Sequence, residues 1–354
     1  MKISALVDDN EKRVAITPET TRKYRELGFE VVLPQNVGVN SGFRDEEYLS
    51  AGSLIWEKQT IPEAELYLCV KPSFEKNMEL KSGSYLVAML SPFQNKENLE
   101  KMRKQGINLC ALERIPRITR AQSMDVLSSQ GNISGYRAVL EALWEYRRVV
   151  SLMMTAAGTI RPARVLVLGA GVAGLQAIAT AKRLGAVVSA FDVRAVTKEQ
   201  VESLGASFVE VDNRDNGETS GGYAREMDDD YKKRQSEKLS RVISETDIAI
   251  TTAQIPGKPA PRLITKEMVT SMATGSVIVD MSTETGGNCE VSQKNKVIQF
   301  EGVTIIGYTD LAARVAHDSS QLFARNVFNF VSLMLRDGKI DTSDEIIQST
   351  LIGV

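Results

Sequence analysis

The chain has 354 residues and a formal net charge of −2, and 43% of its residues are hydrophobic and 25% charged. This length predicts two domains that each bury a core, and the near-zero charge gives no support for nucleic acid or an anionic membrane as a direct partner. No run approaches the roughly eighteen apolar residues of a membrane span, and the N-terminus lacks the core of a signal peptide. We therefore expect a soluble, cytoplasmic chain that does not insert directly into a membrane.

The first third of the chain alternates between apolar strands and helical segments. Thr17-Pro18-Glu19 is typical of a helix start, because threonine caps the helix, proline suits its first turn and glutamate favours its dipole. Strands that alternate with helices predict a parallel sheet covered on both faces. We expect strands at 2–7, 29–33, 65–70, 85–90 and 107–112, and helices between Thr17 and Gly28 and at 44–51 and 96–105.

The segment 113–131 is polar, contains proline and shows little periodicity, so it is predicted to be a loop between domains. A long helix at 132–150 follows, and the α/β pattern then resumes. We expect the last helix, capped by Ser319 or Ser320, to return to the first domain. The remaining expected strands are 164–168, 186–191, 207–211, 247–252, 276–280 and 303–307, with helices at 175–184, 197–204, 229–245 and 319–336, and an acidic linker at 337–345.

Residues 164–174 join a buried strand to a helix through the pattern G-x-G-x-x-G. Gly169 permits the tight turn, Gly171 lets a pyrophosphate approach the backbone, and Gly174 allows the helix to pack closely on the strand. The N-terminus of the helix then offers free N–H groups and a positive dipole end to phosphates. The position of the pattern between a strand and a helix therefore predicts a dinucleotide site.

Asp192 follows the next strand and stands at its carboxyl end. An acid there accepts hydrogen bonds from the ribose 2′-hydroxyl and repels a 2′-phosphate, so NAD(H) is favoured over NADP(H). The alternative is a nucleotide-free turn in which Asp192 caps a helix. Arg194 opposes the preference for NAD(H), and we interpret it as a solvated or phosphate-facing cation.

Two later loops could contact a ligand. The polar insertion 212–231 contains Gly221-Gly222-Tyr223, which suits a lid that folds its tyrosine over a ligand, although a solvated loop is equally consistent. The proline-rich loop 253–261 follows a strand at the edge where open α/β sheets bind ligands.

Candidates for acid/base chemistry are few. The only histidine is His317, which we expect to be structural or exposed. The cysteines lack the spacing of metal ligands, so we expect reduced thiols and no metal site at Cys69, Cys110 and Cys289. Nicotinamide enzymes that oxidise alcohols usually need a histidine as general acid or base. Because this chain has a single histidine, the sequence argues against that class of enzyme. Arg117, Gln122 and Asp125 could hold a nicotinamide and its ribose by oriented hydrogen bonds, or form a surface salt-bridge network.

Long strings of this sequence resemble the NAD(H)-binding first domain of the proton-translocating NAD(P) transhydrogenase family. The strings are 116–130, 169–185, 192–195, 221–227 and 251–261, and the similarity extends from Arg13 to the final helix. The resemblance implies a homodimer of chains that each contain two Rossmann-like, doubly wound parallel-sheet α/β domains with a cleft between them. It places residues 1–127 with 318–354 in an N-terminal lobe, and 128–317 in the NAD(H)-binding domain.

The resemblance also implies roles for particular residues. Arg117, Gln122 and Asp125 hold the nicotinamide end and orient it for catalysis, and Gln254 departs from the family, which commonly has an apolar residue there. The cofactor-binding residues that it implies are Arg117, Ile118, Thr119, Arg120, Gln122, Asp125 and Ser128 at the nicotinamide end, Gly169, Gly171, Val172, Ala173 and Gly174 at the pyrophosphate, Asp192, Val193 and Arg194 at the ribose, Gly222 and Tyr223 on a mobile loop, and Gln235 and Gln254 at further contacts.

In that family, hydride passes directly to NADP(H) held by a separate domain, and a membrane-spanning domain couples the step to proton translocation. Such transfer releases no substrate proton, which agrees with the single histidine. We accordingly expect these two partner domains and a position peripheral to the inner membrane. The rivals are a non-enzymatic NAD(H) sensor and an alanine dehydrogenase. The latter shares Arg13 and Lys71 but has a catalytic histidine where this chain reads Leu90-Ser91-Pro92, and an aspartate where it reads Glu284.

Overall fold

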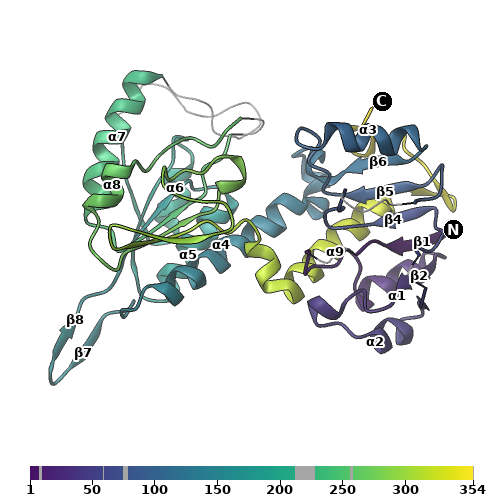
Figure 1. Ribbon diagram of the computed structural model, residues 1–354, viewed down its shortest axis with the longest axis horizontal. Coiled ribbons are helices and arrows are strands. Elements are labelled where there is room, and N and C mark those ends of the chain that lie inside the picture. The colour runs from purple at the N-terminus through teal and green to yellow at the C-terminus, as the bar shows by residue number, and fades with distance from the viewer. Residues whose placement is uncertain (8–9, 59, 75–78, 212–227, 256–257, 354) are drawn as a thin grey trace. The chain divides into compact units, whose positions relative to one another are not determined.

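The computed structural model describes residues 1–7, 10–58, 60–74, 79–211, 228–255 and 258–353 (Figure 1). The chain divides into two compact units, which are described separately below. Unit 1 consists of Met1–Gln130 and Ala312–Val354, and unit 2 consists of Gly131–Leu311. Each unit is a parallel-sheet α/β fold, which confirms the predicted fold class.

Unit 1 is built on a six-stranded sheet in the order β3-β2-β1-β4-β5-β6, in which every neighbouring pair is parallel. The chain adds strands outward from β1 in one direction and then returns past β1 to β4, so the direction of winding reverses between these two strands. The strands are β1 (Lys2–Ala5), β2 (Glu30–Pro34), β3 (Leu54–Trp56), β4 (Leu66–Leu68), β5 (Tyr85–Ala88) and β6 (Asn108–Ala111).

Alternate residues of β4, β5 and β6 in unit 1 enter two different cores. Leu66 and Leu68 of β4 lie in the core that also holds Phe323 of α9, whereas Tyr67 lies in the core that holds Leu99 of α3. Both faces of the sheet are therefore covered, as the apolar runs of the strands require. The helices of unit 1 are α1 (Pro18–Glu26), α2 (Asp45–Ser50), α3 (Lys96–Lys104), α9 (Ala316–Leu333) and α10 (Glu345–Thr350), with the 3-10 turns η1 (Val39–Ser41), η2 (Leu112–Arg114) and η3 (Thr119–Met124).

The C-terminal part of the chain packs on the edge of this sheet. Part of the predicted linker instead forms a small hairpin, β16 (Leu335–Arg336) with β17 (Lys339–Ile340), and α10 follows it. Leu351 then forms an antiparallel bridge with Cys110 of β6, and the Ile352 N–H donates to the Leu109 carbonyl over 3.0 Å. These contacts cover polar groups that an edge strand would otherwise leave unpaired.

Unit 2 is built on a seven-stranded sheet in the order β11-β10-β9-β12-β13-β15-β14. All neighbouring pairs are parallel except β14 and β15, which are antiparallel. The winding reverses at β9, which lies between β10 and β12. The strands are β9 (Arg164–Leu168), β10 (Val187–Phe191), β11 (Ser207–Phe208), β12 (Ile248–Thr251), β13 (Val277–Asp280), β14 (Val297–Phe300) and β15 (Val303–Ile306).

Helices also cover both faces of the sheet in unit 2. Val165 and Val167 of β9 lie in one core with Ala177 of α5, whereas Leu166 and Leu168 lie in a second core with residues of α7 and α8. The helices are α4 (Val126–Glu145), which begins in unit 1, α5 (Val172–Arg183), α6 (Thr197–Ser203), α7 (Asp229–Ser244) and α8 (Lys266–Ser271), with the 3-10 turn η4 (Thr283–Thr285). The 3-10 turn η5 (Leu311–Val315) begins at the last residue of unit 2 and continues into unit 1.

Two local predictions about helices are wrong, and some short strands were not predicted. Helix α4 starts at Val126 and ends at Glu145, instead of running from 132 to 150. Ser319 and Ser320 are buried inside α9, whose N-cap is Val315, so neither caps that helix. The exposed hairpin of β7 (Met153–Thr155) and β8 (Gly158–Ile160) was not predicted. Among the described residues, no helix has the length and apolar character needed to cross a bilayer.

Candidate functional site

The glycine-rich turn follows β9, at the carboxyl edge of the unit 2 sheet and at its reversal of winding. Gly169 has φ +99°, a conformation that side chains rarely adopt, and the Thr252 hydroxyl donates to its carbonyl over 2.9 Å. A Cβ at Gly174 would lie 1.8 Å from the Gly169 carbonyl oxygen, so only glycine fits there. Open α/β sheets bind ligands at such reversals, and the close approach between strand and helix is the one expected for a dinucleotide turn.

The first turn of α5 has N–H groups that no helical carbonyl can satisfy. Its N-cap is Gly171, which has no side chain to cap it, and the first helical bond runs from the Leu175 N–H to the Gly171 carbonyl over 2.8 Å. The N–H groups of Val172, Ala173 and Gly174 therefore remain available at the positive end of the helix dipole. This arrangement fits a phosphate group.

Asp192 stands directly after β10, and its carboxylate faces the same turn. The Ala170 N–H donates to Asp192 Oδ2 over 2.7 Å. Arg194 donates to Oδ1 from its backbone N–H (2.9 Å) and Nε (3.0 Å), and to Oδ2 from Nη2 (2.9 Å). Each oxygen thus accepts two hydrogen bonds, which fills the usual capacity of a carboxylate.

Two expectations about this pair need correction. The Arg194 side chain is only 15% exposed, so its interpretation as a solvated cation is wrong. The alternative in which Asp192 caps a helix is also wrong, because the N-cap of α6 is Val196. Asp192 is at the position expected for a ribose contact, with Arg194 as its present partner.

The other predicted residues of unit 2 lie on α7 and on the loop after β12. Gln235 is buried on α7, and burial together with the nearby Asp192 charge raises the pKa of Tyr231, on the same helix, to about 12. Gln254 is exposed in the loop. Gly222 and Tyr223 lie outside the described residues, as does most of the predicted lid.

The loop that contains Gln254 is held by a buried asparagine that was not predicted. Asn288 donates from Nδ2 to the carbonyls of Ala253 (2.9 Å) and Pro261 (2.8 Å), and its Oδ1 accepts from the Ala253 N–H over 3.1 Å. A single side chain thus satisfies both polar groups of one backbone residue. In the sequence, the feature that pointed to Asn288 was the preceding Gly286-Gly287 turn, where both glycines have positive φ.

In unit 1, Asp125 caps the start of α4. Its Oδ1 accepts from the Ser128 N–H over 2.9 Å and its Oδ2 accepts from the Ser128 hydroxyl over 2.5 Å. An acid whose carboxylate accepts from the N–H three residues later is a recognised helix-start signal. The sequence therefore contained the signal for the true start of α4, and the structure brings the predicted residues Asp125 and Ser128 together.

The 3-10 turn η3, which contains Gln122, is anchored on both sides by other helices. Asn326 and Asn329 of α9 both donate to the Ser123 carbonyl, over 2.8 and 3.0 Å. Arg120 donates to the carboxylates of Asp344 and Glu345 at the start of α10, with contacts of 2.8 Å to each. The predicted residues Arg117, Ile118, Thr119 and Gln122 are exposed on this anchored segment.

An ionic cluster lies beyond the carboxyl ends of the unit 1 strands. The Arg13 side chain is 7% exposed and donates to Glu11 from Nε (2.8 Å) and Nη2 (2.7 Å), and from Nη1 to Gln130 (2.7 Å). Burial acts to raise the pKa of Glu11, but hydrogen bonds and charge from Arg13 outweigh it, so this pKa lies below its ordinary value. Arg13 is thus held by the chain's own side chains.

The predicted divergence from alanine dehydrogenase falls in the same region. The N–H groups of Leu90 and Ser91 donate to the Glu113 carboxylate, and Ser91 has φ +48°. Burial raises the pKa of Glu113 above its ordinary value, although hydrogen bonds and Lys71 oppose the shift. These contacts use backbone groups of Leu90-Ser91-Pro92, the stretch where the resemblance predicts a difference from alanine dehydrogenase.

His317 has a structural environment. Its Nδ1 lies 2.9 Å from the Ser41 carbonyl, and its ring stacks on Phe43 with 4.5 Å between centroids. The three cysteines are buried and form no disulfide with one another, and burial raises the pKa of Cys110 and Cys289 to about 12 and 11, respectively. Among the described residues, no group of histidine, cysteine and carboxylate side chains is arranged to hold a metal ion.

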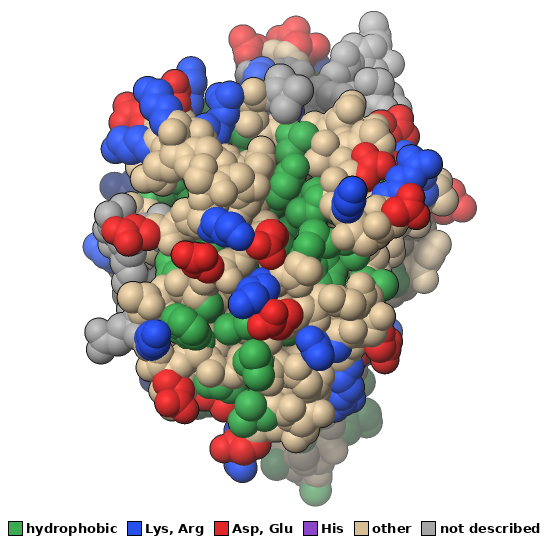
Figure 2. Space-filling model, turned by 90° about the vertical axis from the view of Figure 1, so that its right-hand side faces the viewer, with side chains coloured by type: hydrophobic (Ala, Val, Ile, Leu, Met, Phe, Trp, Pro, Cys, Tyr) green, Lys and Arg blue, Asp and Glu red, His purple; other side chains and the backbone are tan. Residues whose placement is uncertain are grey.

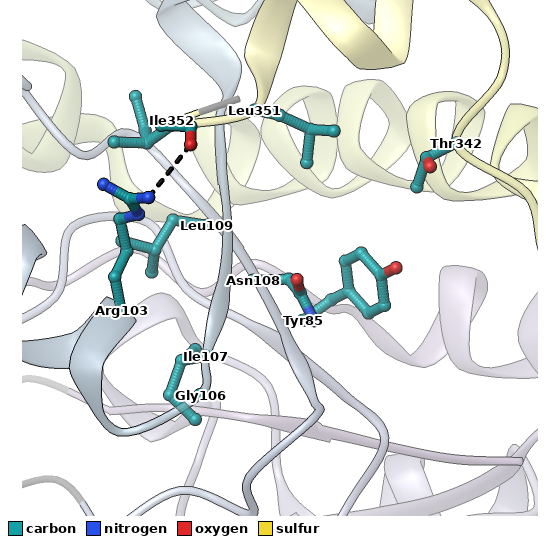
Figure 3. Close-up of a pocket in the computed structure, with 10 residues that line it drawn as sticks. Tyr85, Arg103, Gly106, Ile107, Asn108, Leu109, Thr342, Leu351 and Ile352 are labelled. Atoms are coloured by element: carbon teal, nitrogen blue, oxygen red, sulfur yellow. Dashed lines mark hydrogen bonds between the residues drawn. The ribbon is translucent and has the colours of Figure 1, made fainter.

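A pocket of about 390 Å³ opens in unit 1, away from the predicted site residues (Figure 3). It lies where Leu351–Gly353 cross the end of β6, and its charged side chain, Arg103, donates to the Gly353 carbonyl over 2.9 Å. On the face shown in Figure 2, acidic and basic side chains are intermixed, in agreement with the near-zero net charge.

Family models cover nearly the whole chain. The model described as alanine dehydrogenase/PNT, N-terminal domain, matches residues 5–134, and the model described as alanine dehydrogenase/PNT, C-terminal domain, matches residues 138–353. Both predicted groups of site residues thus fall within matched regions.

Individual relatives separate the two branches of that family. The first part of NAD(P) transhydrogenase subunit alpha of Rickettsia prowazekii (strain Madrid E) is 48% identical over 99% of this chain and 94% of its own length. Alanine dehydrogenase 1 of Staphylococcus aureus (strain N315) is 27% identical over 91% of this chain and 83% of its own length. The crystal structure of transhydrogenase from Sinorhizobium meliloti superposes with a TM-score of 0.87 at 42% identity, covering 99% of this chain and 96% of that one. The chain therefore belongs to the alanine dehydrogenase/PNT family and, within it, to the alpha subunits of NAD(P) transhydrogenases.

Proposed function

We propose that this chain binds NAD(H) and exchanges hydride directly with NADP(H) on a partner domain of a proton-translocating transhydrogenase. The observation that carries the nucleotide proposal is the set of free N–H groups at Val172, Ala173 and Gly174, next to the Asp192 carboxylate. These groups fit a pyrophosphate and a ribose, respectively.

Each unit contributes one group of contacts in this proposal. In unit 2, Gly169, Gly171 and the first turn of α5 cradle the pyrophosphate, and Asp192–Arg194 surround the adenosine ribose. In unit 1, Arg117, Gln122 and Asp125 hold the nicotinamide end. The further proposed contacts are Ile118, Thr119, Arg120 and Ser128 in unit 1, and Gly222, Tyr223, Gln235 and Gln254 in unit 2.

The proposed contribution of the chain to the reaction is orientation. When bound, the reduced nicotinamide supplies the hydride. Gln122 and Arg117 fix the carboxamide end, and the anchored turn η3 keeps the backbone of Gln122 in place. Because no proton is taken from a substrate, no side chain has to act as a general acid or base, and the rate depends on holding two rings close together.

The proposed assembly includes a domain that holds NADP(H) and a membrane-spanning domain that couples hydride transfer to proton translocation. The relatives are named as alpha subunits of transhydrogenases, which supports the existence of partner subunits. We propose that the chain is attached to the inner membrane, on its cytoplasmic side, through these partners.

We propose that a second copy of the chain packs on the hairpin of β7 and β8. The hairpin is exposed throughout, and a two-stranded hairpin by itself is marginally stable in water. Its apolar side chains are also exposed: 56% for Leu152, 44% for Met153, 77% for Met154 and 45% for Ile160. Contiguous exposed apolar surface of this kind indicates an interface.

The direct test is to mix the purified chain with an NADPH-loaded transhydrogenase domain and to follow reduction of an NAD+ analogue by absorbance. We expect turnover only when both proteins are present. Absence of turnover, while the chain binds NADH, would reject the transhydrogenase proposal and leave a sensor of NAD(H).

The alanine dehydrogenase alternative is tested with the chain alone. Alanine and NAD+ should produce no NADH, because this chain reads Leu90-Ser91-Pro92 where the resemblance places the catalytic histidine of that enzyme, and the N–H groups of Leu90 and Ser91 are bound to Glu113. Alanine-dependent formation of NADH by the chain without a partner protein would overturn the proposal.

A further inference from the structure

Helix α4 makes an unusually close contact with the first turn of α5, and a glycine permits it. A Cβ placed on Gly135 of α4 would lie 2.0 Å from the Ala173 carbonyl oxygen, 2.8 Å from its carbon and 3.0 Å from Ala173 Cα. The first two distances are shorter than real Cβ contacts, and the obstructing atoms are backbone. Any side chain at this position would therefore force the two helices apart or tilt the peptide at Ala173.

The obstructed carbonyl belongs to the peptide that presents a phosphate-binding group. The carbonyl of Ala173 and the N–H of Gly174 are parts of one planar peptide unit, so displacing the oxygen also reorients the N–H. That N–H is one of the free donors of the α5 first turn. The approach of α4 thus sets the direction of a donor that we assign to the pyrophosphate.

A second contact joins the same two helices within unit 2. Asn132 of α4 donates from Nδ2 to Gln176 Oε1 of α5 over 3.3 Å. Gly131, the other glycine of α4, has no atom within 4 Å of the position of its Cβ. The helix therefore contains one glycine in tight contact and one in open space, which makes a matched pair for comparison.

We propose that Gly135 is a positioning residue for the phosphate-binding turn, a fourth glycine that acts with Gly169, Gly171 and Gly174 although it lies far outside their sequence pattern. It touches the turn and not the nucleotide. This inference rests on the proposed binding of NAD(H) at the turn, but its geometric part can be measured without any nucleotide.

The experiment compares Gly135→Ala with Gly131→Ala in the full chain. NADH affinity is measured by fluorescence, and ADP and adenosine are measured by competition. We expect Gly135→Ala to weaken NADH and ADP by about tenfold, the size of a helix N-terminal phosphate interaction, and to leave adenosine within about twofold. Gly131→Ala should leave all three affinities unchanged.

A ligand-free readout comes from amide NMR spectra of the same variants. The Gly174 amide resonance should move in Gly135→Ala and stay in place in Gly131→Ala. If Gly135→Ala fails to fold, Asn132→Ala loosens the same contact and should weaken ADP by a smaller factor while leaving adenosine unchanged.

Several results would overturn the inference. Equal losses of affinity for ADP and adenosine would show a general loss of structure. Unchanged affinity for ADP in Gly135→Ala would show that the contact does not position the turn. If Asn132→Ala has to replace that variant, unchanged affinity for ADP in Asn132→Ala would show the same. A wild-type chain that binds neither NADH nor ADP would reject the proposed function itself. A Gly174 amide resonance that does not move in Gly135→Ala would reject the geometric part alone.

Discussion

At the scale of single residues, the main finding is the partner of Asp192. An acid at this position selects NAD(H) because it repels a 2′-phosphate. Here Arg194 donates to both of its oxygens, so its charge is partly neutralised before any nucleotide binds. In the proposed site, a ribose hydroxyl would compete with Arg194 for the carboxylate, so selectivity between NAD(H) and NADP(H) should depend on both residues.

Substitutions of Arg194 and of Asp192 should change the selectivity between NADH and NADPH in opposite directions. Arg194→Ala should increase the ratio of the NADPH to the NADH dissociation constant, because the bare Asp192 charge repels the 2′-phosphate more strongly. Asp192→Ala should lower the same ratio. Fluorescence titrations measure both constants, and Arg164→Ala, which removes an exposed cation paired with Glu245, is the control. An unchanged ratio in both variants would remove this pair from the ribose site.

A second prediction at this scale concerns Gln122, which is exposed on the anchored turn η3. Gln122→Asn shortens the side chain by one methylene and should slow hydride transfer to the partner domain by about tenfold while leaving NADH affinity nearly intact, because orientation is lost and most contacts remain. Stopped-flow kinetics and NADH titration separate the two effects. Equal losses of rate and affinity would show that Gln122 does not orient the ring.

At the scale of elements, α1 and α9 are joined by an ion pair at the surface of unit 1. Glu19 of α1 accepts from Arg325 of α9 over 2.7 Å and from Lys23 over 2.9 Å. The hydrogen bond from Arg325, followed by that from Lys23, lowers the pKa of Glu19 from 4.5 to about 2. Its contribution to stability is therefore present above pH 4.5 and is lost as the pH falls toward 2.

Replacing this carboxylate should have a small effect that depends on pH. Glu19→Gln should lower the melting temperature at pH 7 by roughly 1–2 °C, because exposed ion pairs contribute little. The difference from the wild type should shrink as the pH falls from 4.5 to about 2. Calorimetry over this range measures it, with Glu100→Gln on α3 as the control. A difference that persists at pH 2 would show that the effect is not due to the charge.

At the scale of the whole molecule, unit 2 extends a hairpin that its own core does not support. Met154→Asp places a charge on this surface and should dissociate the proposed homodimer, because burying an unpaired carboxylate is costly. Light scattering coupled to size exclusion measures the mass. Leu54→Asp, at a 55% exposed position in unit 1, should leave the mass unchanged. A wild-type chain that is monomeric at micromolar concentration would contradict the proposal directly.

The central strands of both sheets and most of the helices were predictable from the sequence, because alternating apolar runs with capping and glycine signals depend on local physics. The short strands β3 and β14 and the helices α8 and α10 were not predicted. Thr17 indeed caps α1, with its side chain accepting from Thr20. The start of α4 was missed, although Asp125 and Ser128 formed a cap, because the polar composition around them suggested a loop. The hairpin of β7 and β8 was missed because its exposed residues lack an alternating pattern.

The α/β class, the glycine turn at Gly169–Gly174 and the acid at Asp192 could be read from the sequence, since each depends on the spacing of neighbouring residues. The contacts of Arg194 with that acid, of Asn288 with the loop after β12 and of Gly135 with Ala173 became known from the folded chain alone. The last two contacts join segments far apart in the chain, and the Arg194 pair depends on the rotamer adopted around a folded turn. Local patterns do not encode such contacts, because they exist only once helices and strands are packed at fixed distances.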